Sequence, residues 1–242
     1  MDPKPISKLP LVHPDYRYPA AKNPYALKLK EHPGWAYSDN DIEEFAGHWR
    51  DKFLDLNHKS TRKLIVEIGC NTGHVVREWA LANPKNAYIG IDWKFKIIHR
   101  GVEKAQDKGL KNLIFMRGNV DRIRYMFGAE EIDEIHMYFP DPWPKKSQRK
   151  NRTIQARFLK DAAFALKPNG LFFIKTDHDA YFEWMLEEFN KVEDIWTVEK
   201  VTHDLHAGNS DAHKLEIPTV TLFEKLFIKD GIPIKAAWLR RK

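Results

Sequence analysis

The sequence predicts an α/β protein with a mostly parallel β-sheet and helices on both faces of the sheet. From residue 63 onward, short apolar runs of strand length alternate with segments of helical periodicity. Several of the helical segments end at Gly or Pro, which are residues that terminate helices. Strands that alternate with helices are typical of βαβ units, whose strands are parallel and buried on both faces.

Five strands and five helices are expected within this pattern. The strands are predicted at residues 64–68, 87–92, 113–116, 132–139 and 171–176. The helices are predicted at residues 74–81, 97–108, 122–127, 158–166 and 181–189. The carboxyl ends of parallel strands lie on one edge of a sheet, and ligands bind beyond that edge. The residues that follow each strand are therefore the candidate site residues.

The N-terminal region has a different composition from the rest of the chain. Residues 1–60 contain many prolines among aromatic and basic residues, and we interpret them as an irregular arm followed by a helix. That helix is expected over about residues 41–56, with Asp39 or Asn40 as its N-cap. Residues 61–242 are interpreted as the main domain.

The composition limits the class of protein. Hydrophobic residues make up 43% of the 242 residues, which is enough for a core, and the net charge of +6 is compatible with a polyanionic partner or with an ordinary solvated surface. The single cysteine, Cys70, excludes an internal disulfide and fits a reducing cytoplasm. The sequence has neither an apolar run of membrane-spanning length nor an apolar signal core at its N-terminus, so no membrane association is expected.

The ends of the first three strands suggest a pocket for a nucleoside-type cofactor. Gly69 and Gly73 lie in a turn between a strand and a helix, although Asn71 occupies the place of a second glycine. Asp92 ends the second strand and can accept both hydroxyls of a ribose, whereas Asn119 follows the third strand and can pair with an adenine edge. Taken alone, Asp92 could cap a helix and Asn119 could belong to a turn. Because the dinucleotide fingerprint GxGxxG is absent, S-adenosylmethionine fits this pattern better than a dinucleotide.

The end of the fourth strand is the most informative part of the chain. The segment FPDPWPKK (139–146) holds Asp141 between two prolines, which predicts a stiff turn; its alternative is a structural turn with a capping acid. A basic strip follows, and it suits a phosphate backbone unless it is merely a solvated face. The strip consists of Lys145, Lys146, Arg149, Lys150 and Arg152.

Two further segments carry candidate polar residues. Asp177 follows the fifth strand, and its alternative role is to cap the next helix. Residues 221–224 are interpreted as a period-two strand, in which Thr221 and Phe223 share one face and Glu224 could be an exposed charge of an edge strand. The eleven histidines are not arranged in a zinc pattern, so no metal site is expected, and the chain has no P-loop and no nucleophile elbow.

The chain resembles the tRNA (guanine-N7-)-methyltransferases of the bacterial single-subunit type, over about residues 64–238. The resemblance is carried by seven short blocks of sequence, of which PDPWPKK is the most specific. These blocks are EIG (67–69), GID (90–92), FPDPWPKK (139–146), TD (176–177), DLH (204–206), TxxE (221–224) and GxPI (231–234). The chain departs from the family's usual pattern in three respects, namely Asp92 in place of a glutamate, Asn71 in place of a glycine, and Ser147-Gln148 and Asn151 within the basic strip.

This resemblance implies a Rossmann-like class I S-adenosylmethionine-dependent methyltransferase fold. It implies a cytoplasmic enzyme that methylates the N7 atom of a guanine in the tRNA variable loop (position 46 in tRNA numbering). By the same resemblance, the cofactor site consists of Glu67, Gly69, Gly73, Asp92, Asn119 and Asp141. The substrate nucleotide would be contacted by Lys145, Asp177, Thr221 and Glu224. The sequence does not decide between a monomer and a homodimer.

Asp141 is the candidate catalytic residue, in a positioning and electrostatic role. The N7 atom of neutral guanine carries a free lone pair, so it needs no general base to act as a nucleophile. Aligning the reacting atoms is then the main task of the protein. Two alternatives remain at this point, namely a non-catalytic tRNA-binding protein with a retained methyltransferase fold, and a methyltransferase that acts on a small molecule or a protein.

Overall fold

The computed structural model describes residues 9–53, 63–207 and 220–242. Eight strands form one sheet in the order β1-β4-β3-β2-β5-β6-β8-β7. The strands are β1 (Ala36–Ser38), β2 (Leu64–Ile68), β3 (Ala87–Asp92), β4 (Leu113–Arg117), β5 (Ile132–Tyr138), β6 (Leu166–Thr176), β7 (Trp196–Thr202) and β8 (Lys235–Arg241). The strands from β1 to β6 pair in parallel, whereas β8 runs antiparallel to both β6 and β7. The expected α/β class with a mostly parallel sheet is therefore confirmed.

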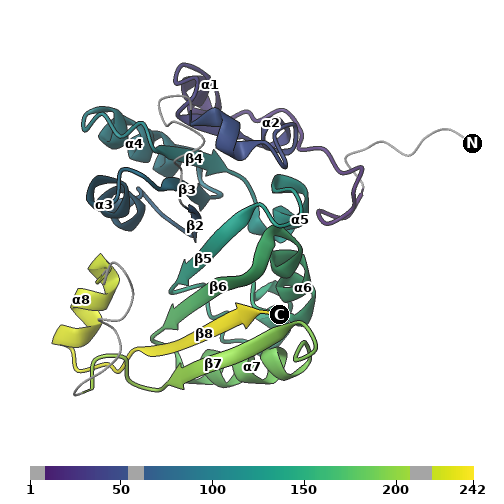
Figure 1. Cartoon of the computed structure of the whole chain (residues 1–242), viewed down its shortest axis with the longest axis vertical. Helices are drawn as coiled ribbons and strands as arrows, with labels where there is room; N and C mark the ends of the chain where they lie inside the picture. Colours follow the sequence, from purple (N-terminus) through teal and green to yellow (C-terminus); the bar gives the residue numbers. More distant parts are fainter. Residues whose placement is uncertain (1–8, 54–62, 208–219) are drawn as a thin grey trace, which may run out of the picture.

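Helices cover both faces of the sheet (Figure 1). The α-helices are α1 (Pro24–Lys30), α2 (Asn40–Glu43), α3 (His74–Ala82), α4 (Phe95–Gln106), α5 (Ile123–Met126), α6 (Ala156–Ala165), α7 (Asp179–Asn190) and α8 (Leu222–Lys229). The 3-10 helices are η2 (Trp49–Lys52), η4 (Val120–Arg122) and η5 (Lys146–Asn151). One buried cluster packs α1, α3 and α4 on one face, and a second packs α5, α6 and α7 on the other. No described helix is long and apolar enough to cross a membrane.

The order of the strands creates a switch point between β2 and β5. The chain runs outward from β2 to β3 and β4, then returns to place β5 on the other side of β2 and continues outward to β6. Their parallel register brings Ile68, Asp92 and Tyr138 to the same edge of the sheet. In open α/β sheets this edge, at the point where the order reverses, is where a crevice for ligands forms.

The prediction of a single helix over residues 41–56 is wrong for residues 41–53. Residues 54–56 lie outside the described residues. Helix α2 ends at Glu43, and the chain turns at Gly47, which has a φ of 87°. The Glu131 carboxylate accepts the backbone N–H groups of Gly47 and Trp49, and the Trp49 indole is fully buried and donates to the Met126 carbonyl. These tertiary contacts replace the helical ones.

Neither expected N-cap of this helix makes a cap with its side chain. Asp39 has a φ of 53° and its carboxylate pairs with Arg117 of β4. Asn40 is the first residue of α2, and its side-chain amide bonds both backbone polar groups of Tyr18. Both side chains therefore tie the N-terminal region to other parts of the fold.

Candidate functional site

The loop between β2 and α3 exposes its backbone at the switch point. Gly69, Asn71 and Gly73 all adopt positive φ values, of 75°, 52° and 68°. Asn71 is thus a tolerated substitute for glycine, because Asn enters the left-handed region more readily than most residues do. A Cβ on Gly73 would lie 2.5 Å from the ring of Phe115, whereas a Cβ on Gly69 would meet no atom within 4 Å. Gly73 is therefore required for packing, and Gly69 leaves open space above the loop.

Glu67 lies beneath this loop and is almost fully buried. Its Oε2 atom accepts the backbone N–H of Val76 at 3.0 Å, so the carboxyl group connects β2 to the first turn of α3. Burial raises the pKa of Glu67 to about 8, although the Val76 N–H and the charge of Lys175 act in the opposite direction. The side chain therefore supports the loop from inside the fold.

Asp92 joins the glycine loop to the next connection. One of its carboxylate oxygens accepts the N–H of Asn71 at 3.2 Å, and the other accepts the N–H of Lys94 at 3.0 Å. A carboxylate has about four lone-pair sites, so both oxygens keep an acceptor site for ligand hydroxyls. The neighbouring Trp93 is 61% exposed, which is unusual for such a large apolar side chain and was not singled out by sequence reasoning.

Asn119 lies at the end of β4 and contacts the N-terminal arm. Its side-chain oxygen accepts the N–H of Asp121 at 3.0 Å and so caps η4. Its own backbone N–H donates to the hydroxyl of Tyr18 at 3.0 Å. The arm therefore reaches the edge of the sheet at the position where an adenine was expected.

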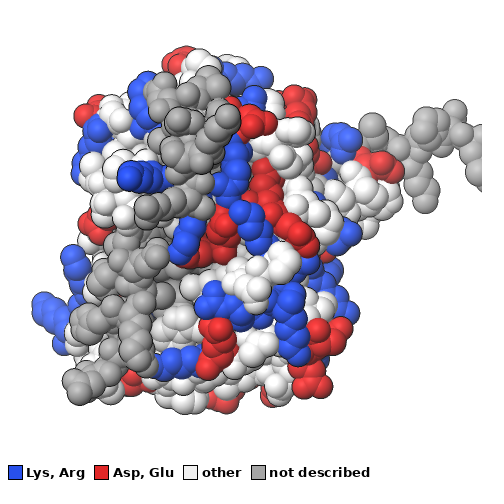
Figure 2. All heavy atoms as spheres, in the orientation of Figure 1, with Lys and Arg blue, Asp and Glu red and all other residues white. Residues whose placement is uncertain are grey.

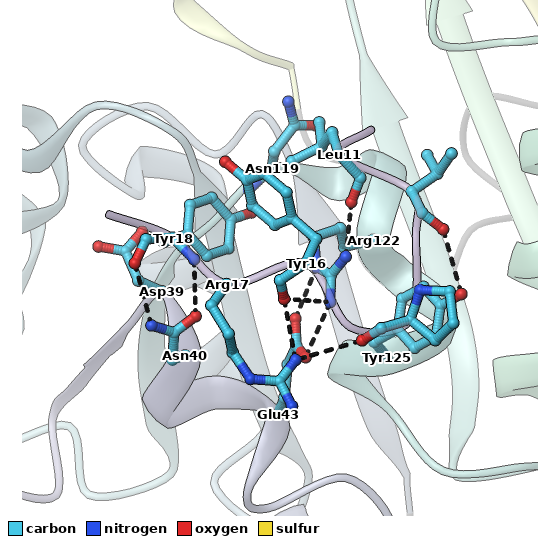
Figure 3. A network of polar contacts seen from close by, with 12 residues as sticks. Leu11, Tyr16, Arg17, Tyr18, Asp39, Asn40, Glu43, Asn119, Arg122 and Tyr125 are labelled. Carbon is cyan, nitrogen blue, oxygen red and sulfur yellow. Dashed lines mark hydrogen bonds and ion pairs between the residues drawn. The ribbon is translucent and has the colours of Figure 1, made fainter. Parts of the chain in front are cut away.

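Arg122 holds the arm in place (Figure 3). Its guanidinium group makes a two-pronged ion pair with Glu43 and donates to the backbone carbonyls of Leu11 and His13. The Arg122 side chain is almost fully buried, and the Tyr125 hydroxyl donates to the Val12 carbonyl at 3.1 Å. A buried arginine that spans such distant segments has no local signal in the sequence.

The Asp141 turn follows β5 on the other side of the switch point. Phe139 and Trp143 both have positive φ values, of 51° and 42°, although each precedes a proline, which ordinarily favours an extended conformation. Bulky residues in this region store about 1–3 kcal/mol of strain each, and such strain concentrates at functional sites. Asp141 itself is exposed to solvent.

Arg152 fixes this turn from below. It was expected in the basic strip, but it is only 2% exposed, and its Nε–H donates to the Pro142 carbonyl at 2.8 Å. Its guanidinium group also lies 4.8 Å from the centroid of the Tyr181 ring. Arg152 is therefore part of the support of the turn.

The remaining members of the basic strip are exposed. Lys145 precedes η5, and Lys146, Arg149 and Lys150 lie within it. On the face shown in Figure 2, basic and acidic side chains are interspersed rather than gathered into one continuous positive field. On this face the positive charge is therefore distributed in local groups of basic side chains.

Asp177 follows β6 but does not cap the next helix. The N-cap of α7 is His178, whose ring Nδ1 accepts the N–H of Tyr181 at 3.2 Å. The Asp177 carbonyl accepts from the ammonium group of Lys235 at 3.1 Å, and the side chain of Asp177 is partly exposed. Its carboxylate is thus left out of the cap and lies at the same edge of the sheet as the Asp141 turn.

Thr221 and Glu224 begin a helix, so the predicted period-two strand is wrong. The Thr221 hydroxyl accepts the N–H of Glu224 and the Glu224 carboxylate accepts the N–H of Thr221, which together form the capping box of α8. Threonine followed three residues later by glutamate is the signal that could have identified this helix start. Glu224 has no exposed surface. Its Oε2 atom accepts from the Lys175 ammonium group at 2.6 Å, and its Oε1 atom lies 2.8 Å from Nε2 of the His206 ring. The interpretation of Glu224 as an exposed charge on an edge strand is therefore wrong as well.

The arrangement as a whole suits a nucleoside ligand next to a rigid acid. The exposed Gly69 backbone, the free acceptor sites of Asp92 and the exposed Trp93 provide surfaces for a sugar and an aromatic base, so these residues fit S-adenosylmethionine. The Asp141 turn follows β5, which pairs directly with β2 in the sheet. Within the described residues, no cluster of three or more His, Cys, Asp or Glu side chains could hold a metal ion.

Comparison with known proteins identifies relatives along most of the chain. A family model described as putative methyltransferase matches residues 61–237. A tRNA (guanine-N(7)-)-methyltransferase of Enterococcus faecalis is 35% identical over 213 residues, which cover 85% of this chain and 94% of that protein. A bifunctional glycosyltransferase/methyltransferase of Fusobacterium nucleatum is 32% identical over 207 residues. That match spans 85% of this chain but only 30% of the length of the bifunctional protein.

Solved structures share the fold at low sequence identity. The 16S rRNA methyltransferase KamB superimposes with a TM-score of 0.57 and 15% sequence identity, over 79% of this chain and 93% of that one. The cyclase SpnF also matches, with a TM-score of 0.51 and 14% identity over 80% of this chain and 79% of that one. Because a cyclase shares this fold, the structural likeness supports the architecture and leaves the reaction to be argued from the site.

Proposed function

The chain belongs to the tRNA (guanine-N7-)-methyltransferase family, and from this premise we propose that it methylates the N7 atom of a guanine in tRNA, with S-adenosylmethionine as methyl donor. We further propose that this guanine lies in the variable loop. The observation that carries the proposal is that the open glycine loop after β2 and the strained Asp141 turn after β5 meet at one switch point. A methyl donor and an acceptor base have to meet in such a place.

The cofactor would be held by the first three strand ends. Gly69 allows close approach to the loop backbone, Gly73 keeps the loop packed, and Glu67 supports it from below. Asp92 has acceptor sites for the ribose hydroxyls, and Asn119 lies where the adenine is expected. When bound, S-adenosylmethionine supplies an electrophilic methyl group.

Asp141 would align the guanine rather than remove a proton from it. Its two flanking prolines and the bond from Arg152 to the Pro142 carbonyl limit the movement of the turn, so the carboxylate is placed before the base arrives. A carboxylate accepts from the donor edge of guanine, which adenine lacks. Its negative charge also favours the positive charge that the purine gains on methylation.

The other candidate residues divide into two groups. We propose that Lys145 and Asp177 contact the guanosine or its phosphate directly, because both are at least partly exposed at this edge. Thr221 and Glu224 contribute through the start of α8, since their polar groups are engaged within the capping box. We also propose that residues 1–60 act as an arm on a methyltransferase domain of residues 61–242, and that the enzyme acts in the cytoplasm, where tRNA is found.

Incubation with unmodified tRNA and S-adenosylmethionine, followed by mass spectrometry of the nucleosides, tests this function. The expected product is 7-methylguanosine, located to the variable loop by sequencing of the fragments. Binding of tRNA without methyl transfer would instead favour a non-catalytic tRNA-binding protein. Transfer to other acceptors but not to tRNA would favour a methyltransferase of another substrate class.

A further inference from the structure

Helix α8 is attached to the protein mainly by one buried carboxylate and by one partly buried apolar side chain, Phe227. Glu224 is the one residue within α8 that is buried, whereas Leu222, Phe223 and Leu226 are between 56% and 58% exposed. An amphipathic helix of a globular protein normally buries its apolar side chains against the core. With so little apolar surface buried, the position of α8 depends on the contacts of Glu224 and Phe227.

Glu224 is held by two residues from other parts of the chain. Lys175 lies on β6, is 2% exposed, and its ammonium group lies 2.6 Å from Glu224 Oε2. His206 follows β7, is partly exposed, and its Nε2 atom lies 2.8 Å from Glu224 Oε1. Together with the Thr221 N–H, these contacts occupy both carboxylate oxygens.

Lys175 also connects this cluster to the Asp141 turn. Its backbone carbonyl accepts the N–H of Phe139 at 2.8 Å, and its ammonium group lies 4.3 Å from the centroid of the Tyr138 ring. Phe139 in turn packs on Phe227 of α8, with ring centroids 5.4 Å apart. The lysine therefore contacts both α8 and the turn that bears Asp141.

A buried ion pair is weak evidence for a stabilising role. Removing two charges from water costs about as much as their attraction returns, and such pairs are often replaced by apolar residues without loss of stability. Their directional contacts can instead select one arrangement of the chain among several. This reasoning favours a role for the cluster in placing α8 rather than in overall stability.

We propose that Lys175 and His206 are positioning residues for the tRNA substrate, which act through Glu224 to hold the start of α8 beside the Asp141 turn. This inference rests on the proposed function and adds two residues to it. Neither residue needs to touch the guanosine. Their effect is to set the distance between α8 and Asp141 when the nucleotide binds between them.

The test compares one variant that breaks the cluster with another that removes it altogether. Lys175→Met leaves a buried carboxylate without its cation, so both the melting temperature and the affinity for tRNA should fall. Lys175→Met with Glu224→Met removes the unpaired charge, so the melting temperature should recover. The KM for tRNA should nevertheless stay about tenfold to a hundredfold above that of the wild type, because misplaced binding groups are costly even when the fold is intact. Recovery of KM together with the melting temperature would overturn the proposal.

A second pair of variants examines His206 by conservative rescue. His206→Gln keeps a side-chain N–H for Glu224 and should change the KM for tRNA by less than about twofold, whereas His206→Leu should raise it about tenfold or more. The matched control is Glu199→Gln, which removes an exposed ion pair with Arg240 between β7 and β8 and should leave KM unchanged. Equal effects of His206→Gln and His206→Leu would contradict the proposal.

Hydrogen exchange separates this inference from the proposed function. Amides of α8 should exchange faster in Lys175→Met than in Glu199→Gln, because the ion pair between Lys175 and Glu224 that holds the helix is lost. If the wild-type chain does not methylate tRNA, the proposed function fails, and the exchange of α8 still decides whether Lys175 holds the helix. Unchanged exchange in α8 would refute the role of Lys175 in either case.

Discussion

Asp141 is an exposed carboxylate on a turn that leaves its backbone little freedom. We expect Asp141→Asn to lower turnover about 10²-fold or more, because the amide keeps the shape but loses the charge and offers a donor where guanine needs an acceptor. Binding of S-adenosylmethionine and of tRNA should persist, and single-turnover methylation assays would measure the loss. Asp194→Asn serves as the control, because Asp194 is exposed and lies just before β7. Near-normal turnover in Asp141→Asn would assign the acid a structural role only.

Glu67 makes the stability of the ligand-free protein depend on pH. Its pKa rises from 4.5 to about 8 on folding, so the folded state holds this proton more tightly than the unfolded state does. The stability that the protonated Glu67 carboxyl group contributes to the folded state is complete below pH 4.5 and is lost as the pH rises to about 8. At about 1.4 kcal/mol per pH unit, the loss is at most about 5 kcal/mol.

Glu67→Gln should remove this dependence on pH. The amide oxygen can still accept the Val76 N–H but does not titrate, so the variant should gain stability relative to the wild type as the pH rises from about 5 to about 8. Urea unfolding across this range would measure the difference. Parallel pH curves for the two proteins would show that Glu67 is already ionised in the fold.

At the scale of elements, η5 is the best candidate for contact with the tRNA backbone. Lys146→Ala with Lys150→Ala should weaken tRNA binding and reduce the slope of log affinity against log salt by roughly one unit or somewhat less for each lost contact. Affinity for S-adenosylmethionine should be unchanged in calorimetry. Lys85→Ala with Lys108→Ala is a matched control, because both lysines are exposed and precede the starts of β3 and β4, at the opposite edge of the sheet. An unchanged slope would identify η5 as an ordinary solvated face and would favour a substrate other than tRNA.

The strained Asp141 turn shows how two elements cooperate. Strand β5 delivers Phe139 and Pro140 to the edge of the sheet, and the buried Arg152 just after η5 binds back to the Pro142 carbonyl. The positive φ of Phe139 and Trp143 persists because contacts on both sides of the turn outweigh its local cost. A rigid acid and an exposed basic helix are thereby built from one continuous segment of sequence.

At the scale of the whole molecule, Arg122 connects the N-terminal arm to the sheet. Arg122→Met should lower the free energy of unfolding by about 3 kcal/mol or more, because it leaves the Glu43 carboxylate and several arm carbonyls without their donor. Limited proteolysis should cut the arm faster in the variant. The control is Arg124→Met, whose side chain is about half exposed, whose nearest acid is 3.9 Å away and whose guanidinium lies 4.2 Å from the centroid of the Phe164 ring. It should change stability by no more than about 1 kcal/mol. Equal protease sensitivity of the two variants would mean that the arm is held by other contacts.

Much of the central fold could be predicted from local patterns. The strands β2 to β5 and the helices α3, α4 and α7 lie within a few residues of their expected positions, because continuous apolar runs and helix-ending Gly and Pro are local signals. The strands β1, β7 and β8 and the helix α1 were missed. In β8, charged residues and alanines hide a strand that is formed by pairing with both β6 and β7.

The sequence by itself determined the α/β class, the family, and which residues follow each strand, since these depend on the order of residues along the chain. Only the tertiary structure decided which charges are buried. Lys175 and Glu224 are 49 residues apart, and Arg122 and Glu43 are 79 residues apart. A charged side chain is expected on the surface unless a partner compensates its loss of water, and that partner is known only when the chain has folded.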